Sequence, residues 1–271
     1  MTIEEALSLQ QQGRFNDARQ IYQSLLRKDP KHQVLYHLGI LELQTGEIDR
    51  ALKILVQVVK KQPNNAPYHV ILGKVMVQLG RFQQAAQYFS QASLLEPNAK
   101  HFFLLGKTKL HLKDSESAID CWKKALNNDP NHLNALLFLG SSYEEQLEFE
   151  KALTLFKRAH HIAPNDPRVV DFISHCYSQK ADTLYEKMPP KALEQINQAL
   201  QYKQTAHLFH QKSEILQVLG ESKQAEKFCL RAIQENPEAL YFYTLGNIYR
   251  TSRRKTQALK AYQQAKEMGL K

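Results

Sequence analysis

The chain has 271 residues, of which 43% are hydrophobic and 23% are charged. This composition provides enough apolar residues for a buried core and excludes an intrinsically disordered chain. Three cysteines without a CxxC pair argue against a disulfide framework and fit a reducing compartment. The formal net charge of +9 raises nucleic acid or an acidic protein as a partner to test against the rest of the sequence.

The N-terminal segment carries no signal for export or for membrane insertion. It includes Glu4 and Glu5, so it is acidic where a signal peptide would be basic, and no apolar segment follows. The apolar runs, of which residues 133–140 form one of the densest, are much shorter than the ~18 residues that a membrane span needs. We therefore expect a cytoplasmic chain without a membrane span.

The chain is predicted to form eight pairs of short amphipathic helices. In the first helix of a pair, apolar residues recur at helical spacing, as Leu35, Leu38 and Leu43 do. Glycines separate the two helices of several pairs, at Gly13, Gly46, Gly80 and Gly220. Prolines, which cannot continue a helix, end most of the second helices, at Pro30, Pro63, Pro97, Pro130, Pro164 and Pro237. The pairs lie near residues 1–32, 33–65, 66–98, 99–132, 133–166, 167–205, 206–238 and 239–271.

Three kinds of landmark residue recur in these pairs. The first helix has a small residue, at Ala6, Gly39, Gly73, Gly106, Gly140, Ser174, Ser213 and Gly246. The second helix has an alanine, at Ala18, Ala51, Ala85, Ala118, Ala152, Ala192, Ala225 and Ala258. Four residues later stands a mostly large side chain, at Tyr22, Leu55, Phe89, Trp122, Phe156, Ile196, Cys229 and Tyr262. Because small side chains let two helices approach closely, we predict that the helices cross there and that the large side chain fills the gap.

Two charged residues depart from the apolar pattern of the first helices. Glu42 and Lys109 stand where an aromatic or aliphatic side chain is expected. We interpret both as local rotations of the helix, in which Leu43 and Leu110 take the buried position instead.

The sixth pair contains an insertion at residues 178–190, which lengthens one alanine spacing to 40 residues where the others are 33 or 34. Tyr177, Leu184 and Met188 keep helical spacing, which predicts about two extra turns on the first helix, ended by Pro189 and Pro190. Two interpretations stay open: a tolerated surface insertion, or a projecting helix that forms one wall of a ligand groove.

The fifth pair contains, in order, Leu136, Leu139, Gly140, Tyr143, Ala152, Phe156, Ala159 and Pro164. This run resembles the tetratricopeptide repeat pattern, W-x2-L-G-x2-Y…A-x3-F…P, with Leu136 in the place of the tryptophan. The resemblance extends over the whole chain and implies a single all-α, right-handed solenoid of residues 1–271. It also implies a non-enzymatic scaffold or adaptor that binds another protein or a peptide in a concave groove lined by the first helices.

The groove positions that this resemblance implies carry mainly apolar side chains in the second to fifth pairs, together with two lysines. The predicted lining consists of Tyr36, His37, Ile40, Val70, Ile71, Lys74, Phe103, Leu104, Lys107, Leu137, Phe138 and Phe172. Such a surface suits an amphipathic helix or an extended apolar segment with acidic groups, which the lysines would contact. The alternative is that these side chains only complete the packing between neighbouring first helices.

Catalytic motifs are absent from the sequence, and we predict neither an enzyme nor a cofactor. One pair of short motifs has the spacing of a metal site or of a pH-sensitive site: Asp171-x3-His175 and His210-x3-Glu214. Ordinary hydrogen bonds within a polar groove are the alternative for these four residues. Besides a scaffold, two functions therefore stay open: a metal- or pH-responsive adaptor, and a targeting or regulatory module for an enzyme such as a glycosyl- or sulfotransferase.

The positive charge is concentrated at the C-terminus. Residues 250–271 contain seven basic residues and one acidic residue, a net +6, which leaves +3 for the preceding 249 residues. Nucleic-acid readers need basic groups along a whole groove, so we predict no nucleic-acid binding. The segment is either a solubilising terminal repeat or a docking edge for an acidic partner, formed by Arg250, Arg253, Arg254 and Lys255. Self-association through the ends of the solenoid is a further possibility.

Overall fold

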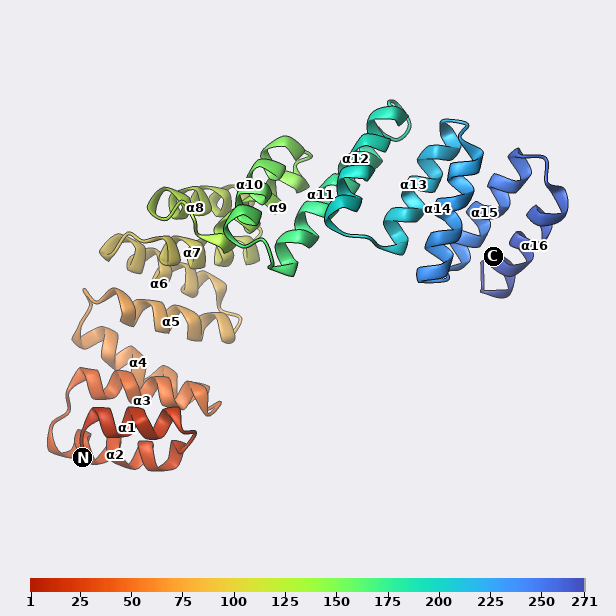
Figure 1. Ribbon diagram of the computed structural model, residues 1–271. Coiled ribbons are helices and arrows are strands. Elements are labelled where there is room, and N and C mark those ends of the chain that lie inside the picture. Colours follow the sequence, from red (N-terminus) through yellow and green to blue (C-terminus); the bar gives the residue numbers. More distant parts are fainter. Residues whose placement is uncertain (271) are drawn as a thin grey trace. The chain divides into compact units, whose positions relative to one another are not determined.

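The computed structural model describes residues 1–270, which form sixteen α-helices and no strand, in consecutive antiparallel pairs (Figure 1). The helices are α1 Ile3–Gln11, α2 Phe15–Lys28, α3 His32–Gln44, α4 Ile48–Lys61, α5 Ala66–Gln78, α6 Phe82–Leu95, α7 Ala99–His111, α8 Ser115–Asn128, α9 Leu133–Glu145, α10 Phe149–Ile162, α11 Pro167–Leu184, α12 Pro189–Tyr202, α13 Ala206–Val218, α14 Ser222–Glu235, α15 Ala239–Thr251 and α16 Lys255–Glu267. The predicted all-α class and the eight helix pairs are thus confirmed.

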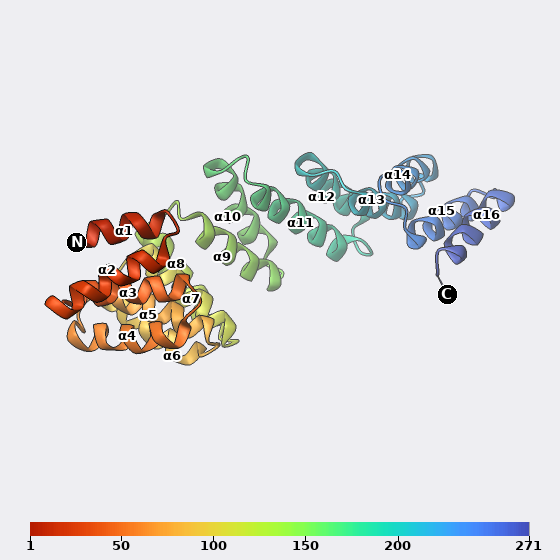
Figure 2. The same cartoon turned by 90° about the horizontal axis from the view of Figure 1, so that it is seen from below.

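The chain divides within α9 into two compact units, residues 1–135 and residues 136–271. In the first unit, α1 to α8 stack as four pairs (Figure 2). In the second unit, α11 packs on α12, α13 on α14 and α15 on α16, and α13 also contacts α15. That both units form one continuous solenoid stays a prediction.

The crossing of the two helices in a pair depends on the small residue of the first helix. A Cβ atom at Gly140 would lie 2.4 Å from the Phe156 ring, and one at Gly73 would lie 2.7 Å from the Phe89 ring. Gly106 has the same relation to the fully buried Trp122, at 2.6 Å. The large side chain therefore fills the space that the missing Cβ leaves, as the sequence predicts.

In seven of the eight pairs, the backbone between the two helices passes through the left-handed region at one fixed position, and the sixth pair is the exception. Glycine occupies it in several repeats, with φ of +77° at Gly13 and +83° at Gly46. Lys113, Leu147 and Arg253 occupy the same position in other repeats, with φ near +60°. The conformation is therefore required by the turn itself, and glycine only adopts it at lower cost.

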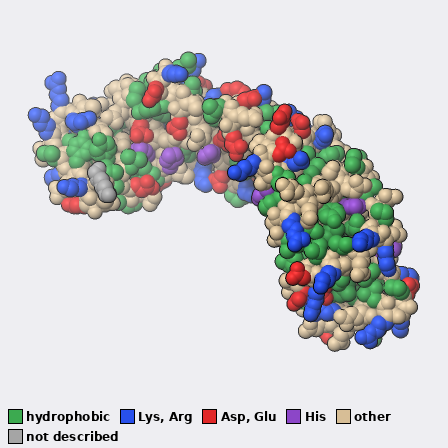
Figure 3. Space-filling model, turned by 180° about the vertical axis from the view of Figure 1, so that it is seen from behind, with side chains coloured by type: hydrophobic (Ala, Val, Ile, Leu, Met, Phe, Trp, Pro, Cys, Tyr) green, Lys and Arg blue, Asp and Glu red, His purple; other side chains and the backbone are tan. Residues whose placement is uncertain are grey.

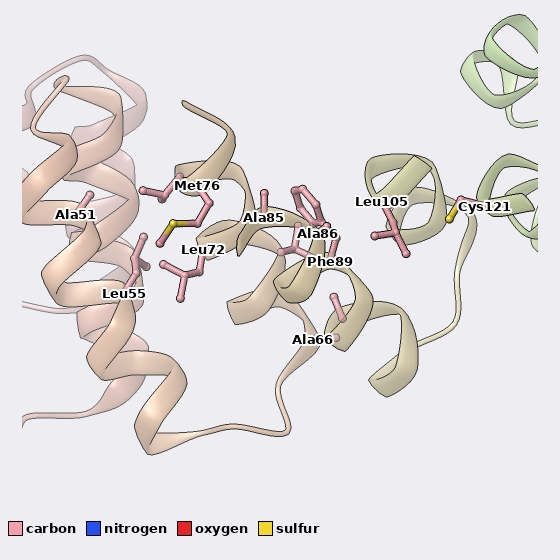
Figure 4. Close-up of a cluster of buried hydrophobic side chains, with 13 residues drawn as sticks. Ala51, Leu55, Ala66, Leu72, Met76, Ala85, Ala86, Phe89, Leu105 and Cys121 are labelled. Carbon is pink, nitrogen blue, oxygen red and sulfur yellow. The ribbon is translucent and has the colours of Figure 1, made fainter. Parts of the chain in front are cut away.

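The core of the first unit lies between successive pairs. Figure 4 shows side chains of α4, α5, α6 and α7 pointing toward one another, among them Leu55, Leu72 and Phe89. All three are at most 1% exposed. One helix pair alone would leave these side chains in water, so each pair depends on its neighbours for burial.

The interpretation of Glu42 as a local rotation is wrong. Its side chain is buried at 3% exposure, while Leu43 is only half-buried. The carboxylate is retained there because Arg19 of α2 donates two hydrogen bonds to it, from Nε at 2.8 Å and from Nη2 at 3.1 Å. Lys109 likewise keeps a polar partner, since its Nζ lies 3.1 Å from Asp114 Oδ2.

The insertion in the sixth pair lengthens α11 to 18 residues, against 13 for α9 and α13. Helix α11 ends at Leu184, before the two prolines, and Pro189 is the first residue of α12. The role predicted for Pro189 and Pro190 is therefore wrong: they begin the second helix and do not end the first. Proline is well suited to this place, because the first helical residues lack an intrahelical acceptor for their N–H groups.

Candidate functional site

A pocket of about 300 Å³ opens between α5 and α7 of the first unit. Its lining consists of Lys74, Val77, Gln78, Phe89, Leu104, Lys107, Thr108 and His111. Lys74 and Lys107 are exposed, and neither has an acidic side chain within 4 Å in residues 1–270. The pocket thus combines an apolar floor with two ammonium groups that are free to meet a ligand.

Three of the pocket residues, Lys74, Leu104 and Lys107, belong to the predicted groove lining. Thr108 and His111 also line the pocket but are not among the residues predicted from the sequence. His111 follows Lys107 by four residues, one helical turn, and this spacing was the available signal. The ring of His111 stacks on Phe82 of α6, with centroids 4.6 Å apart, and this contact orients the imidazole.

The predicted lining residues of α3 form an aromatic cluster with their neighbours. Tyr36 contacts Tyr68 of α5 with ring centroids 4.8 Å apart, and His37 lies 5.4 Å from Tyr36. Burial lowers the pKa of His37, which favours the neutral imidazole. Ile40, on the same helix, is half-buried. These side chains therefore join adjacent repeats and expose only part of their surface.

The other predicted lining residues fall into two groups. Val70, at 9% exposure, and Leu137, at 2%, are buried in the packing between helices and present almost no surface to a partner. Ile71, Phe103, Phe138 and Phe172 are half-buried. Phe103 contacts His132 at 5.2 Å, and Phe172 stacks on Phe156 at 5.3 Å. Leu137, Phe138 and Phe172 belong to the second unit, so a groove that continues through both units stays a prediction.

Three of the four metal-ligand candidates of the second unit, Asp171, His175 and His210, have a partner outside the set. Asp171 binds Lys203, and the Nδ1 atom of His175 lies 2.9 Å from Glu144 Oε1. His210 is buried, with its Nε2 atom 2.8 Å from Thr244 Oγ1 and its ring stacked on Tyr241. In the part of the chain that the structure describes, no three His, Cys, Asp or Glu side chains gather around a common point. Asp171, His175 and His210 thus have partners for hydrogen bonds or ion pairs, and a metal- or pH-responsive site stays a prediction.

His210 and Glu214 lie in a polar network that links α11, α13 and α15. Ser178 donates to Gln211 Oε1 at 2.6 Å, and Gln211 Nε2 donates to Asp182 Oδ1 at 2.8 Å. The carboxylate of Glu214 lies 3.6 Å from His210 Nδ1. Burial lowers the pKa of His210 to about 4 and raises the pKa of Glu214 to about 7, with a further rise from Asp182. Burial therefore favours the neutral form of both His210 and Glu214.

Replacing Glu214 by glutamine is expected to stabilise the protein more at pH 8 than at pH 5. The pKa of Glu214 is higher in the folded protein than its ordinary value of 4.5, so the unfolded chain releases this proton first. The contribution of Glu214 to the free energy of unfolding therefore falls as the pH rises from 4.5 to about 7. Urea denaturation of both proteins at pH 5, 6.5 and 8 measures the difference, and an equal difference at all three values would contradict the raised pKa.

The predicted basic edge at α15 and α16 is only partly free. Arg254 donates to Glu226 of α14 at 3.0 Å, and its guanidinium lies 4.4 Å from the centre of the Tyr249 ring. It thus connects the last two repeats. Arg250, Arg253 and Lys255 are exposed, and Arg253 occupies the left-handed turn position.

Sequence profiles of the tetratricopeptide repeat match residues 9–75, 70–120, 103–167 and 239–268. The chain belongs to the tetratricopeptide repeat family. The helix pairs, the close glycine crossings and the left-handed turns described above are this family's repeat in three dimensions. No helix in residues 1–270 combines the length and the apolar character that crossing a membrane would require.

Two curated relatives are themselves tetratricopeptide repeat proteins. The TPR repeat-containing protein MJ1428 of Methanocaldococcus jannaschii is 24% identical over 289 residues, covering 95% of this chain and 49% of the relative. The TPR repeat-containing protein YpiA of Bacillus subtilis is 23% identical over 208 residues, covering 76% of this chain and 46% of the relative. The chain thus spans about half the length of the curated relatives that it matches.

Among solved structures, the C-terminal part of a TPR repeat-containing protein from Cytophaga hutchinsonii has a TM-score of 0.68 at 14% identity. The match covers 86% of this tetratricopeptide repeat chain and 95% of that one. At this level of identity the similarity shows the shared fold alone.

Proposed function

We propose that this protein is a scaffold or adaptor that binds an apolar segment with acidic groups at the α5–α7 pocket. Tetratricopeptide repeat proteins mediate protein–protein interactions, and the relatives described above belong to this class. The observation that carries the proposal is that Lys74 and Lys107 line the same pocket as the apolar side chains of Val77, Leu104 and Phe89.

The chemistry of the pocket selects the kind of ligand. An apolar side chain that enters it exchanges contact with water for contact with Leu104 and Val77, which favours binding. The two exposed lysines of the lining attract carboxylates that flank this side chain in the ligand, and they repel a basic segment. A pocket of this size takes one or two side chains, so we infer that the ligand is a short segment anchored by one large apolar residue.

The neighbouring aromatic cluster supports the proposal. Tyr36 and His37 lie on α3, which is the first helix of the pair before α5 and α6. Both side chains keep part of their surface exposed. A helical or extended partner that runs across the first helices would therefore meet aromatic rings on one side of the pocket and Phe103 on the other. Aromatic side chains contribute large contact areas at low cost in conformational entropy.

Selection of short peptides from a displayed random library tests the proposal. Peptides retained by the protein are expected to share a large apolar residue flanked by Asp or Glu. Reversing both charges with Lys74→Glu and Lys107→Glu should weaken their binding about tenfold or more, because two attractive contacts become repulsive. Lys53→Glu with Lys60→Glu, on the exposed face of α4, is the matched control and should leave the affinity unchanged. An equal loss in both double variants, or selected peptides without acidic residues, would refute the α5–α7 site.

A further inference from the structure

The last helix pair presents an apolar face that no other described helix covers. Leu259 of α16 is 70% exposed, and Tyr243 of α15 is 44% exposed. The ring of Tyr243 lies 5.6 Å from that of Tyr262, which packs closely over Gly246 and donates its hydroxyl to Asn247 at 2.8 Å. These contacts hold the aromatic side chains of the face in place before any partner arrives.

The same positions in earlier repeats are covered. Leu259 follows the second-helix alanine by one residue, and the equivalent residues Ile119 and Leu153 are only 7% and 4% exposed. Leu52, at the same position in α4, packs into the cluster that contains Leu72 and Val75 of the following helix α5. In the first unit, Leu52 of α4 is thus covered by α5, the first helix of the next repeat.

The residues equivalent to Tyr243 in other repeats are also covered by a neighbouring first helix. It precedes the small residue of the first helix by three residues, as Tyr36 and His210 do in their own repeats. Tyr36 contacts Tyr68 of α5 at 4.8 Å, and His210 stacks on Tyr241 of α15 at 4.6 Å. Both positions of the α15–α16 face therefore correspond to surfaces that accept a helix elsewhere in this chain.

The charge around the face indicates what kind of helix it accepts. In residues 250–270 there are six basic side chains and one acidic side chain, Glu267. One of the six, Arg254, is already bound to Glu226. The other five are exposed and have no ion pair among the described residues; they are Arg250, Arg253, Lys255, Lys260 and Lys266. Figure 3 shows Lys and Arg side chains around a hydrophobic patch at the α15–α16 end.

We propose that the α15–α16 face binds an amphipathic helix from another protein, with an apolar stripe over Leu259 and Tyr243 and acidic residues beside it. The helical form follows from the way in which the equivalent positions of other repeats are covered. The acidic character follows from the basic rim, where a basic helix would meet repulsion from five unpaired cations. This site is separate from the α5–α7 pocket and does not depend on it.

A pair of synthetic peptides provides the probe. Each has about 18 residues, with leucine at helical spacing on one face; the remaining positions carry mostly glutamate in one peptide and lysine in the other. Binding is measured by fluorescence anisotropy to a Lys74→Gln/Lys107→Gln protein, in which the α5–α7 pocket attracts neither glutamate nor lysine side chains. The glutamate peptide is expected to bind, and more weakly at high salt, while the lysine peptide does not bind.

Variants of two equally exposed leucines locate the site. Leu259→Glu is expected to weaken binding of the glutamate peptide about tenfold or more, because it places a charge in the apolar contact. Leu94→Glu is the matched control, since Leu94 is 73% exposed on the second helix α6, and it should leave the affinity unchanged. Lys255→Glu with Arg250→Glu should reduce the preference for the glutamate peptide, because three unpaired cations then face two new carboxylates. Circular dichroism of each variant verifies the fold.

Three results would overturn the proposal. One is equal loss of affinity in Leu94→Glu and Leu259→Glu, which would mean that the peptide does not select this face. Another is equally tight binding of the lysine peptide. The third is a dimer of the protein in sedimentation experiments that Leu259→Glu dissociates, because the face would then be occupied by a second copy of this chain.

Discussion

Replacing Trp122 by alanine is expected to lower the free energy of unfolding by about 3–5 kcal/mol. Trp122 is the only tryptophan of the chain, it is fully buried in α8, and it fills the space beside Gly106. The cavity left by the indole cannot collapse, because the helix positions are also held by the neighbouring repeats. Urea denaturation followed by circular dichroism measures the loss.

Two control variants make this prediction specific. Trp122→Phe should cost clearly less, because Phe89 and Phe156 fill the same position in other repeats. Leu94→Ala, at a residue that is 73% exposed, should stay within about 0.5 kcal/mol of the wild-type protein. Amide hydrogen exchange should show the loss of protection for Trp122→Ala in α7 and α8 first. A cost no larger than that of Leu94→Ala would mean that the indole does not support the crossing.

Replacing Arg19 by alanine is expected to cost about 3–5 kcal/mol, because it leaves the buried carboxylate of Glu42 without its partner. Arg19 makes both of the ion-pair hydrogen bonds to Glu42, and its Nη2 also donates to Thr45 at 3.1 Å. Few other donors can reach a side chain that is 3% exposed. Chemical denaturation of the variant at neutral pH measures the effect.

The chain contains a matched pair at its surface. Arg14 and Asp17 also form an ion pair, but both side chains are about half exposed, so Arg14→Ala should cost less than about 1 kcal/mol. The double variant Arg19→Met/Glu42→Leu should recover most of the stability, because an apolar pair removes the uncompensated charge. Similar costs for Arg19→Ala and Arg14→Ala would show that the buried pair contributes no more than a surface pair.

The recurring landmarks were sufficient to predict the helix pairs and their crossings. Gly39, Gly73 and Gly140 recur at a fixed spacing, and each lies against the large residue that the sequence assigns to it. This information is local, because helical spacing and turn residues act within about one repeat. The same holds for the turns, where Gly13 and Gly46 have the backbone conformation that glycine adopts most easily.

The candidate site was predicted less completely, because exposure depends on what covers a position. Lys74, Leu104 and Lys107 meet in one pocket, whereas Val70 and Leu137 occupy similar positions and are buried. All five lie on helix faces that the sequence pattern treats alike. The packing of the adjacent helices determines which of these side chains a partner can reach.

The all-α fold, the eight helix pairs, the turn positions and the concentration of positive charge near the C-terminus all follow from the amino-acid sequence. How polar residues on predicted apolar faces find partners is known only from the packed helices. Glu42 is buried because Arg19 comes from the preceding helix, and His210 is neutral because α15 encloses it. The periodicity of a helix shows which of its faces is apolar. Whether a side chain on that face is buried or forms an ion pair depends on the residues of the helix packed against it.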